Sequence, residues 1–259
     1  MPTPKETYHK LLNYGTKFLG LDLKYFASGG FWNGSGQFVN GLLSFLLVIA
    51  FANLLPKETY GLYRYILSIA GILNIFTLTG MNQAVLQAVS TGNEGALKTS
   101  VKYQLKWNLM MLSAFWILGA YYFLNGNQTF AVSFFILGVF SPLIAALNTY
   151  GAYLAGKKEF RLNNIFSVIS TSIYAASIIT AIILSNGVVG LVVAFSLATF
   201  AANLIFYIAT LRIFKPPAAA PAGGVLKYGR ELTFIGFIGP IVSQIDSIIL
   251  NHFWGPIQL

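Results

Sequence analysis

Asp246 is the only acidic residue within the apolar segments that the sequence predicts to cross a membrane. A charged side chain at the centre of a bilayer costs at least ~2.5 kcal/mol on insertion scales, so such residues are functional by default. We expect Asp246 to bind a coupling ion, either a proton or a sodium ion, or to pair with a base in a transport cavity. The alternative is a structural ion pair with a base from another part of the protein.

Uncharged amide side chains form a second group of candidates, because hydrocarbon offers them no hydrogen-bond partners. Interhelical hydrogen bonds explain any one of them, but as a set they predict a hydrophilic cavity. Four are the preferred cavity residues, on the first, second and seventh predicted spans: Gln37, Asn40, Asn74 and Gln244. The remaining members of the set are Asn82, Gln83, Asn108, Asn148, Asn163 and Asn203.

Arg64 is a candidate for binding a pyrophosphate or a sugar acid, because its guanidinium group matches phosphate oxygens in pairs. The alternative is that it reaches the outer lipid headgroups beside Tyr60, Tyr63 and Tyr65. Gly80 and Pro240 are hinge candidates for a rocking motion, although either could equally be a static kink.

The remaining residues do not indicate covalent catalysis. The chain has no cysteine and only seven acids, none of which forms an Asp-x-Asp pair, so no catalytic residue is predicted and an enzyme is not expected. His9 and His252 have no companions at ligand spacing, so no metal site is predicted. No nucleotide-type glycine loop is present, and we expect no cofactor.

The composition is that of a membrane protein. The chain is 56% hydrophobic and only 9% charged, against about 25% charged in soluble domains. Its net charge of +9 is carried in segments between apolar spans. This pattern follows the positive-inside rule, and we expect no nucleic-acid partner.

Long uncharged stretches predict six spans in residues 31–211. The first two run over 31–55 and 62–90 and are joined by a polar turn at 56–61, and residues 77–80 interrupt the second span. Residues 107–156 and 162–211 are each too long for one helix, and each contains an Asn-Gly turn signal, so they predict two helical hairpins.

Three further segments complete the predicted organisation. Residues 1–30 form a basic segment at the membrane interface or a loosely ordered basic tail. Residues 212–231 form a cytoplasmic linker rich in Pro, Ala and Gly, and 232–259 begin a further apolar helix. We therefore expect the chain to be the N-terminal portion of a longer protein.

The distribution of basic residues predicts the orientation. Of the 16 Lys and Arg residues, 14 lie in the N-terminal segment and in three of the predicted loops, all on one side. The chain should therefore be a multi-pass protein of the cytoplasmic membrane with its N-terminus in the cytoplasm.

Nearly the whole chain resembles the N-terminal half of the polysaccharide biosynthesis (Wzx-type) lipid-linked oligosaccharide flippases of the multidrug/oligosaccharidyl-lipid/polysaccharide exporter superfamily. The resemblance is carried by LGLDLKYFASGGFW leading into FANLLPKETYGLYRYILSIAGILNIFTLTGMNQAVLQAVSTGNEG, and by KYGRELTFIGFIGPIVSQIDSIILNHFWGP. The most specific piece is LLPKETYGLYRY. The resemblance implies an all-α, polytopic, MATE-like transporter with two six-helix bundles related by a pseudo-twofold axis. This chain would supply the first bundle and the first helix of the second.

The same resemblance implies the function. Alternating access would move an undecaprenyl-pyrophosphate-linked oligosaccharide to the outer leaflet for O-antigen-type lipopolysaccharide or other surface polysaccharide. The expected partners are this lipid-linked sugar, membrane lipids and other polysaccharide-assembly proteins. The alternatives are a drug or cation exporter of the same superfamily, a membrane glycosyltransferase or polymerase, and a purely structural membrane subunit.

The coupling role of Asp246 gives a direct prediction. Replacing it in Asp246→Asn removes the titratable charge at nearly constant volume, so transport driven by an ion gradient should be lost. The measurement is export of surface polysaccharide by cells that carry the variant. Unchanged export would end the coupling hypothesis.

Overall fold

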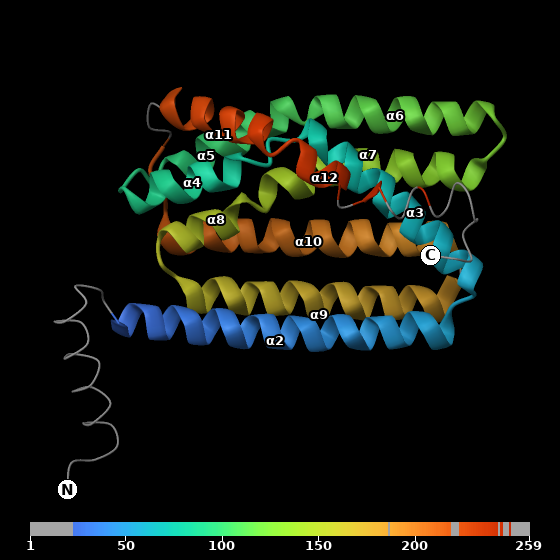
Figure 1. The fold of residues 1–259 in the computed structure, drawn as a ribbon, viewed down its shortest axis with the longest axis horizontal. Coiled ribbons are helices and arrows are strands. Elements are labelled where there is room, and N and C mark those ends of the chain that lie inside the picture. Colours follow the sequence, from blue (N-terminus) through green and yellow to red (C-terminus); the bar gives the residue numbers. More distant parts are fainter. Residues whose placement is uncertain (1–22, 186, 219–222, 243, 246–248, 250–259) are drawn as a thin grey trace, which may run out of the picture.

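The computed structural model describes residues 23–185, 187–218, 223–242, 244–245 and 249, and every regular element in these ranges is a helix (Figure 1). Five helical segments are long and apolar enough to cross a membrane, or six if a bent pair counts as one span. The predicted all-α, polytopic membrane architecture is confirmed over this part of the chain. Asp246 lies outside the described residues.

The first helix, α2 (Leu23–Leu54), is longer than the predicted span. The predicted boundary at residue 30 falls inside it, because the pair Gly29 and Gly30 does not end the helix. Gly29 lies against the ring of Phe160, and a Cβ placed there would approach that ring to 3.2 Å. Pro56 then precedes α3 (Lys57–Leu73), where its fixed φ and missing N–H suit a helix start.

The second predicted span is bent where its sequence is interrupted. After α3 come a short 3₁₀ turn, η1 (Asn74–Phe76), and α4 (Met81–Ser90), with a 57° bend between the two helical parts. Thr77 is extended, and its hydroxyl donates a hydrogen bond of 2.7 Å to the carbonyl of Asn74. The Thr77 hydroxyl therefore gives a hydrogen-bond partner to one of the carbonyl groups exposed where the helix ends.

The two predicted hairpins are present, with additional breaks. The helices are α5 (Ala96–Trp107), α6 (Leu109–Leu124), α7 (Gln128–Leu147), α8 (Thr149–Gly156), α9 (Phe160–Ser185) and α10 (Val188–Phe214). Between α6 and α7, Gly126 adopts φ +77°, and Asn127 caps α7 by accepting from the N–H of Phe130 at 3.1 Å. Asn108 and Asn148 separate α5 from α6 and α7 from α8, which the sequence did not indicate.

Five long helices lie side by side in the order α2, α9, α10, α7 and α6, with α3 crossing the last three (Figure 1). Two buried apolar clusters hold this array together. One joins α2, α3, α6, α7, α9 and α10, and the other joins α4, α5, α8 and the adjoining parts of α9 and α10. The junction between these clusters is where the cavity described below lies.

The predicted linker at 212–231 is narrower in the structure. Helix α10 continues to Phe214, and α11 (Gly223–Ile235) begins inside the predicted linker and packs on α4. Gly229 permits this contact, because a Cβ there would lie 2.8 Å from the sulfur of Met81. The predicted single helix from 232 is also interrupted, since α11 ends at Ile235 and a short α12 covers Ile238–Val242.

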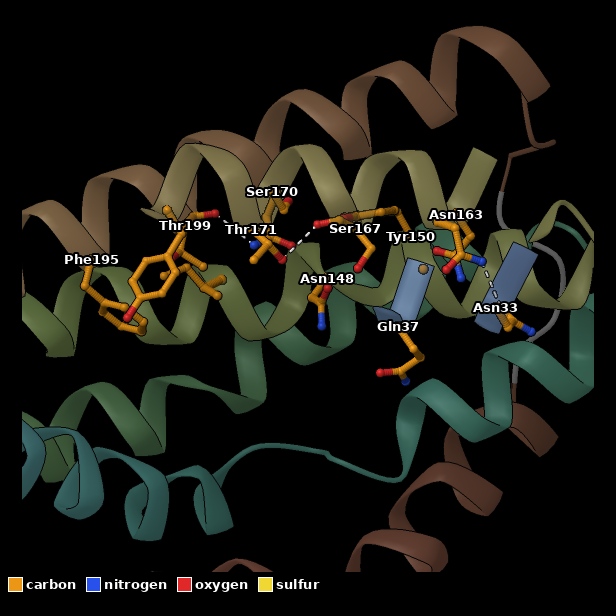
Figure 2. Close-up of a pocket in the computed structure, with 15 residues that line it drawn as sticks. Asn33, Gln37, Asn148, Tyr150, Asn163, Ser167, Ser170, Thr171, Phe195 and Thr199 are labelled. Atoms are coloured by element: carbon orange, nitrogen blue, oxygen red, sulfur yellow. Dashed lines mark hydrogen bonds between the residues drawn. The ribbon is translucent and has the colours of Figure 1, made fainter. Parts of the chain in front are cut away.

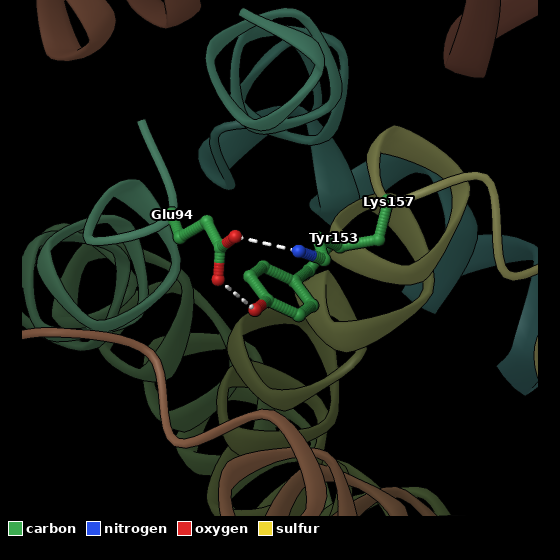
Figure 3. A network of polar contacts seen from close by, with 3 residues as sticks. All are labelled: Glu94, Tyr153 and Lys157. Carbon is green, nitrogen blue, oxygen red and sulfur yellow. Dashed lines mark hydrogen bonds and ion pairs between the residues drawn. The ribbon is translucent and has the colours of Figure 1, made fainter. Parts of the chain in front are cut away.

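Two of the segments predicted to share the cytoplasmic side, the α4–α5 connection and the α8–α9 connection, lie at the same end of the bundle as the start of α2 (Figure 1). A polar network ties these two segments together there (Figure 3). Glu94, between α4 and α5, accepts hydrogen bonds from the ammonium group of Lys157 and, at 2.9 Å, from the hydroxyl of Tyr153. The hydrogen bond from Lys157 lowers the pKa of the Glu94 carboxyl, with smaller contributions from the other contacts.

This network predicts a pH-dependent stability. Because the folded-state pKa of Glu94 is lowered, its contribution is complete above the unfolded value of about 4.3 and is lost as pH falls through the folded value. Glu94→Gln should therefore lower the Tm at pH 7 by an amount equivalent to about 1 kcal/mol or less.

The measurement is thermal unfolding in detergent at pH 7 and near pH 3, where variant and parent should converge. Glu231→Gln is the matched control, because Glu231 and Lys227 form an exposed pair 3.9 Å apart that should contribute little. A deficit of equal size at both pH values would contradict this account.

Candidate functional site

A polar cavity of about 580 Å³ lies between α2, α8, α9 and α10, with one residue from α7 (Figure 2). This volume is within the range of about 300–1,000 Å³ typical of small-molecule sites. The lining residues are Asn33, Gln37, Ile144, Asn148, Tyr150, Gly151, Asn163, Asn164, Ser167, Ser170, Thr171, Tyr174, Phe195, Thr199 and Asn203.

Helix α9 contributes the largest share of the polar wall. Its cavity-lining side chains recur at helical spacing on one face and include Tyr174. Figure 2 shows four others along the helix: Asn163, Ser167, Ser170 and Thr171. On the same helix Ile165 and Ile169 are exposed, as expected for side chains that meet lipid. This polar stripe was readable in the sequence, but the search for amides alone missed its hydroxyl members.

Helix α2 closes one side of the cavity through contacts with α9. Asn164 donates a 2.8 Å hydrogen bond to the side-chain oxygen of Asn33, and Asn40 donates one of 2.9 Å to the hydroxyl of Ser167. Gly36 allows the helices to approach, because any Cβ there would overlap the Asn164 side chain. The polar first half of α2 therefore faces α9, as its sequence requires in a bilayer.

Helix α10 places a buried amide at the cavity wall. The Asn203 side-chain amide donates a 2.8 Å hydrogen bond to the carbonyl of Thr199, one turn earlier. Its side-chain oxygen is buried and accepts no hydrogen bond from any residue that the structure describes. Aromatic rings complete this wall, with Tyr174 and Phe195 packed edge to face 5.9 Å apart.

Within the part of the chain that the structure describes, no Lys, Arg, His, Asp or Glu lines the cavity. The nearest basic residue along α9 is Arg161, whose guanidinium lies 5.3 Å from the ring centre of Trp32 on α2. No group of acids, histidines or cysteines suited to a metal ion occurs within the described ranges. The chemistry available is thus hydrogen bonding and ring stacking by neutral groups.

The structure brings only part of the preferred set to this cavity. Gln37 lines it, and Asn40 adjoins it through Ser167. Arg64 and Asn74 are exposed on the α3 side and do not line it. Gln244 packs on α3, where a Cβ on Gly71 would meet its side chain at 2.8 Å.

We expected the first, second and seventh predicted spans to line the cavity. The described lining instead comes from α2, α7, α8, α9 and α10, which correspond to the first, fourth, fifth and sixth predicted spans. The wider amide set was more informative, because Asn148, Asn163 and Asn203 belong to it and line the cavity. Asn108 instead forms an interhelical hydrogen bond, the alternative role expected for such amides. It is fully buried, and its side-chain amide donates to the carbonyl of Pro142 at 2.8 Å.

Gly80, a predicted hinge, lies at the 57° bend and is tightly packed. Its N–H donates to the hydroxyl of Thr233 at 3.0 Å, and a Cβ on Gly80 would lie 2.5 Å from the backbone nitrogen of that residue. The contact with α11 accounts for glycine at this position. Pro240 lies within α12, and the hinge role of either residue remains a prediction.

Gly80→Ala should destabilise the protein by about 1–3 kcal/mol, because the added methyl group meets backbone atoms that cannot rotate away. The measurement is the thermal unfolding midpoint in detergent. Gly41→Ala is the control, since a Cβ at this helical position meets nothing within 4 Å. Equal midpoints for the two variants would show that α11 does not pack on α4 as described.

A comparison with known protein families gave one result that bears on this site. The family model described as "Polysaccharide biosynthesis protein" matches residues 26–258, which is nearly the whole chain. Searches of curated proteins and of solved structures found no match. The match includes every helix that lines the polar cavity, and it confirms the family that the sequence resembled. The chain therefore belongs to the polysaccharide biosynthesis protein family, the family of the Wzx-type flippases, with a membrane-associated role in polysaccharide synthesis.

Proposed function

We propose that this protein is part of a transporter that flips a lipid-linked oligosaccharide across the cytoplasmic membrane. The observation that carries the proposal is a neutral polar cavity inside an otherwise apolar helical bundle. A sugar headgroup crossing a bilayer needs such a surface, because its hydroxyl groups lose their water partners in hydrocarbon. Movement requires no covalent step, so we propose a transporter and not an enzyme.

The outer face of the cavity wall suits the lipid part of the substrate. Beside the seam between α2 and α9 there is an apolar groove of about 220 Å³, which shares Asn164 with the polar cavity. Its other lining residues include Trp32, Val39, Val168 and Ile169. A molecule with a polar head and a hydrocarbon tail meets complementary surfaces on the two sides of this seam.

The remaining assignments belong to the same proposal. The N-terminus lies in the cytoplasm, Asp246 couples transport to a proton or sodium gradient, and Arg64 meets phosphate or lipid headgroups on the opposite side. Partner proteins of polysaccharide assembly deliver and remove the substrate. A drug or cation exporter is the weaker alternative, because the described residues of the cavity wall include no carboxylate to attract a cation.

The test is complementation of a bacterial strain that lacks its own flippase for a lipid-linked oligosaccharide. Expression of the gene should restore surface polysaccharide, and Thr171→Phe should abolish the restoration because the ring fills the cavity. Thr180→Phe is a matched control on the same helix. Both threonines donate their hydroxyl to the carbonyl four residues earlier, but Thr180 is exposed and lies outside the cavity.

Restoration by the parent and by Thr180→Phe, but not by Thr171→Phe, is the expected result. Equal restoration by both variants would remove the cavity from the transport path. Failure of the parent in strains that make several different lipid-linked sugars, with the protein present in the membrane, would contradict the flippase proposal.

A further inference from the structure

We infer that the cavity binds an uncharged, hydroxyl-bearing sugar unit and excludes anionic groups, so that the phosphate groups of the substrate stay outside it. This inference rests on the proposed function and adds the chemical class of headgroup that the cavity accepts. The main evidence is the side-chain oxygen of Asn203, a buried hydrogen-bond acceptor without a donor, which belongs to a cavity wall of neutral polar groups.

Asn203 supplies that acceptor. The residue is 6% exposed, and one of the two N–H groups of its side-chain amide donates to the carbonyl of Thr199. The side-chain oxygen therefore needs a donor from a ligand or from water, because a buried acceptor left unpaired is costly. A sugar hydroxyl can donate to it, whereas an ionised carboxylate or a fully ionised phosphate has only acceptors to offer.

The rest of the wall fits the same class of ligand. The hydroxyl group of Thr171 and the amides of Gln37, Asn148 and Asn163 can each exchange hydrogen bonds with sugar hydroxyls. The rings of Tyr174 and Phe195 offer apolar surface for the C–H face of a pyranose.

An anion would be poorly held at the same place. Moving a charge out of water is costly unless a counter-charge and hydrogen-bond donors receive it, and no Lys, Arg or His is among the described residues of the cavity wall. The first turn of α9 carries Arg161, which stacks on Trp32 and does not line the cavity. Charge thus separates the two parts of the substrate, with neutral sugar in the cavity and phosphate at the basic end of the bundle.

The absence of cysteine from the sequence permits a direct test. Thr199→Cys places a single thiol on the cavity wall, and Asn125→Cys places one in the exposed turn between α6 and α7. Each full-length variant is put in lipid nanodiscs, and its rate of modification by a water-soluble thiosulfonate is measured. The probes are methyl β-glucoside, glucuronate and inorganic pyrophosphate, each titrated at constant ionic strength.

Methyl β-glucoside should slow modification of Thr199→Cys at least threefold and saturably, while glucuronate and pyrophosphate should not. None of the three should affect Asn125→Cys. Adding Asn203→Leu should raise the half-effective glucoside concentration about fivefold, the effect of one lost hydrogen bond. Asn53→Leu is the matched control, since Asn53 also donates to the carbonyl four residues earlier but is exposed on α2.

The inference would be overturned if pyrophosphate or glucuronate protected the thiol as well as the glucoside does. It would also be overturned if no probe protected the thiol, or if the thiol at position 199 never reacted. These results differ from failure of the proposed function. A chain that binds glucoside selectively but does not restore surface polysaccharide would keep the neutral sugar site and lose the flippase.

Discussion

The constraint on which this structure depends is that hydrocarbon provides no hydrogen-bond partners, so every polar group in the bundle must be satisfied by protein or by enclosed water. It explains the helical architecture and also the positions of the polar side chains. The side-chain amide of Asn108 donates to the carbonyl of Pro142, and that of Gln104 donates to the hydroxyl of Thr149. Both bonds are buried within the helical hairpin predicted at residues 107–156 and its adjoining helix α5. Two buried side-chain oxygens that lack such a partner, those of Ser170 on α9 and Asn203 on α10, instead belong to residues that line a common cavity.

The same constraint links packing to function at the seam between α2 and α9. Gly36 and Asn164 bring the two helices together, and two interhelical hydrogen bonds close the polar side. Most large apolar side chains of α2 face outward, with Phe38 74% exposed, as suits a helix in contact with lipid. One thin wall therefore separates a polar cavity from the outer apolar surface, which is the geometry that the proposed substrate, with a sugar head and a lipid tail, requires.

The sequence predicted the coarse fold well because charge-free stretches and Asn-Gly turns are local signals. It placed the bend near Gly80 and the turn at Asn125 and Gly126 correctly. It could not predict that α11 begins within the Pro- and Gly-rich linker, because the contact of Gly229 with α4 is a tertiary effect. For the site, amides were a useful but incomplete guide. Asn74 and Gln244, two of the preferred amides, do not line this cavity, because the sequence does not tell which helices are neighbours.

One face of α9 should border water in the polar cavity, while the other should border lipid. The most direct measurement is spin-label accessibility along α9, with single cysteines introduced one at a time from 163 to 174 in nanodiscs. We predict that labels at Ser167, Ser170 and Thr171 collide with a water-soluble nickel chelate, and that labels at Ile165 and Ile169 collide with oxygen. Accessibility to oxygen at every position, with no helical periodicity, would contradict the cavity and the transport function built on it.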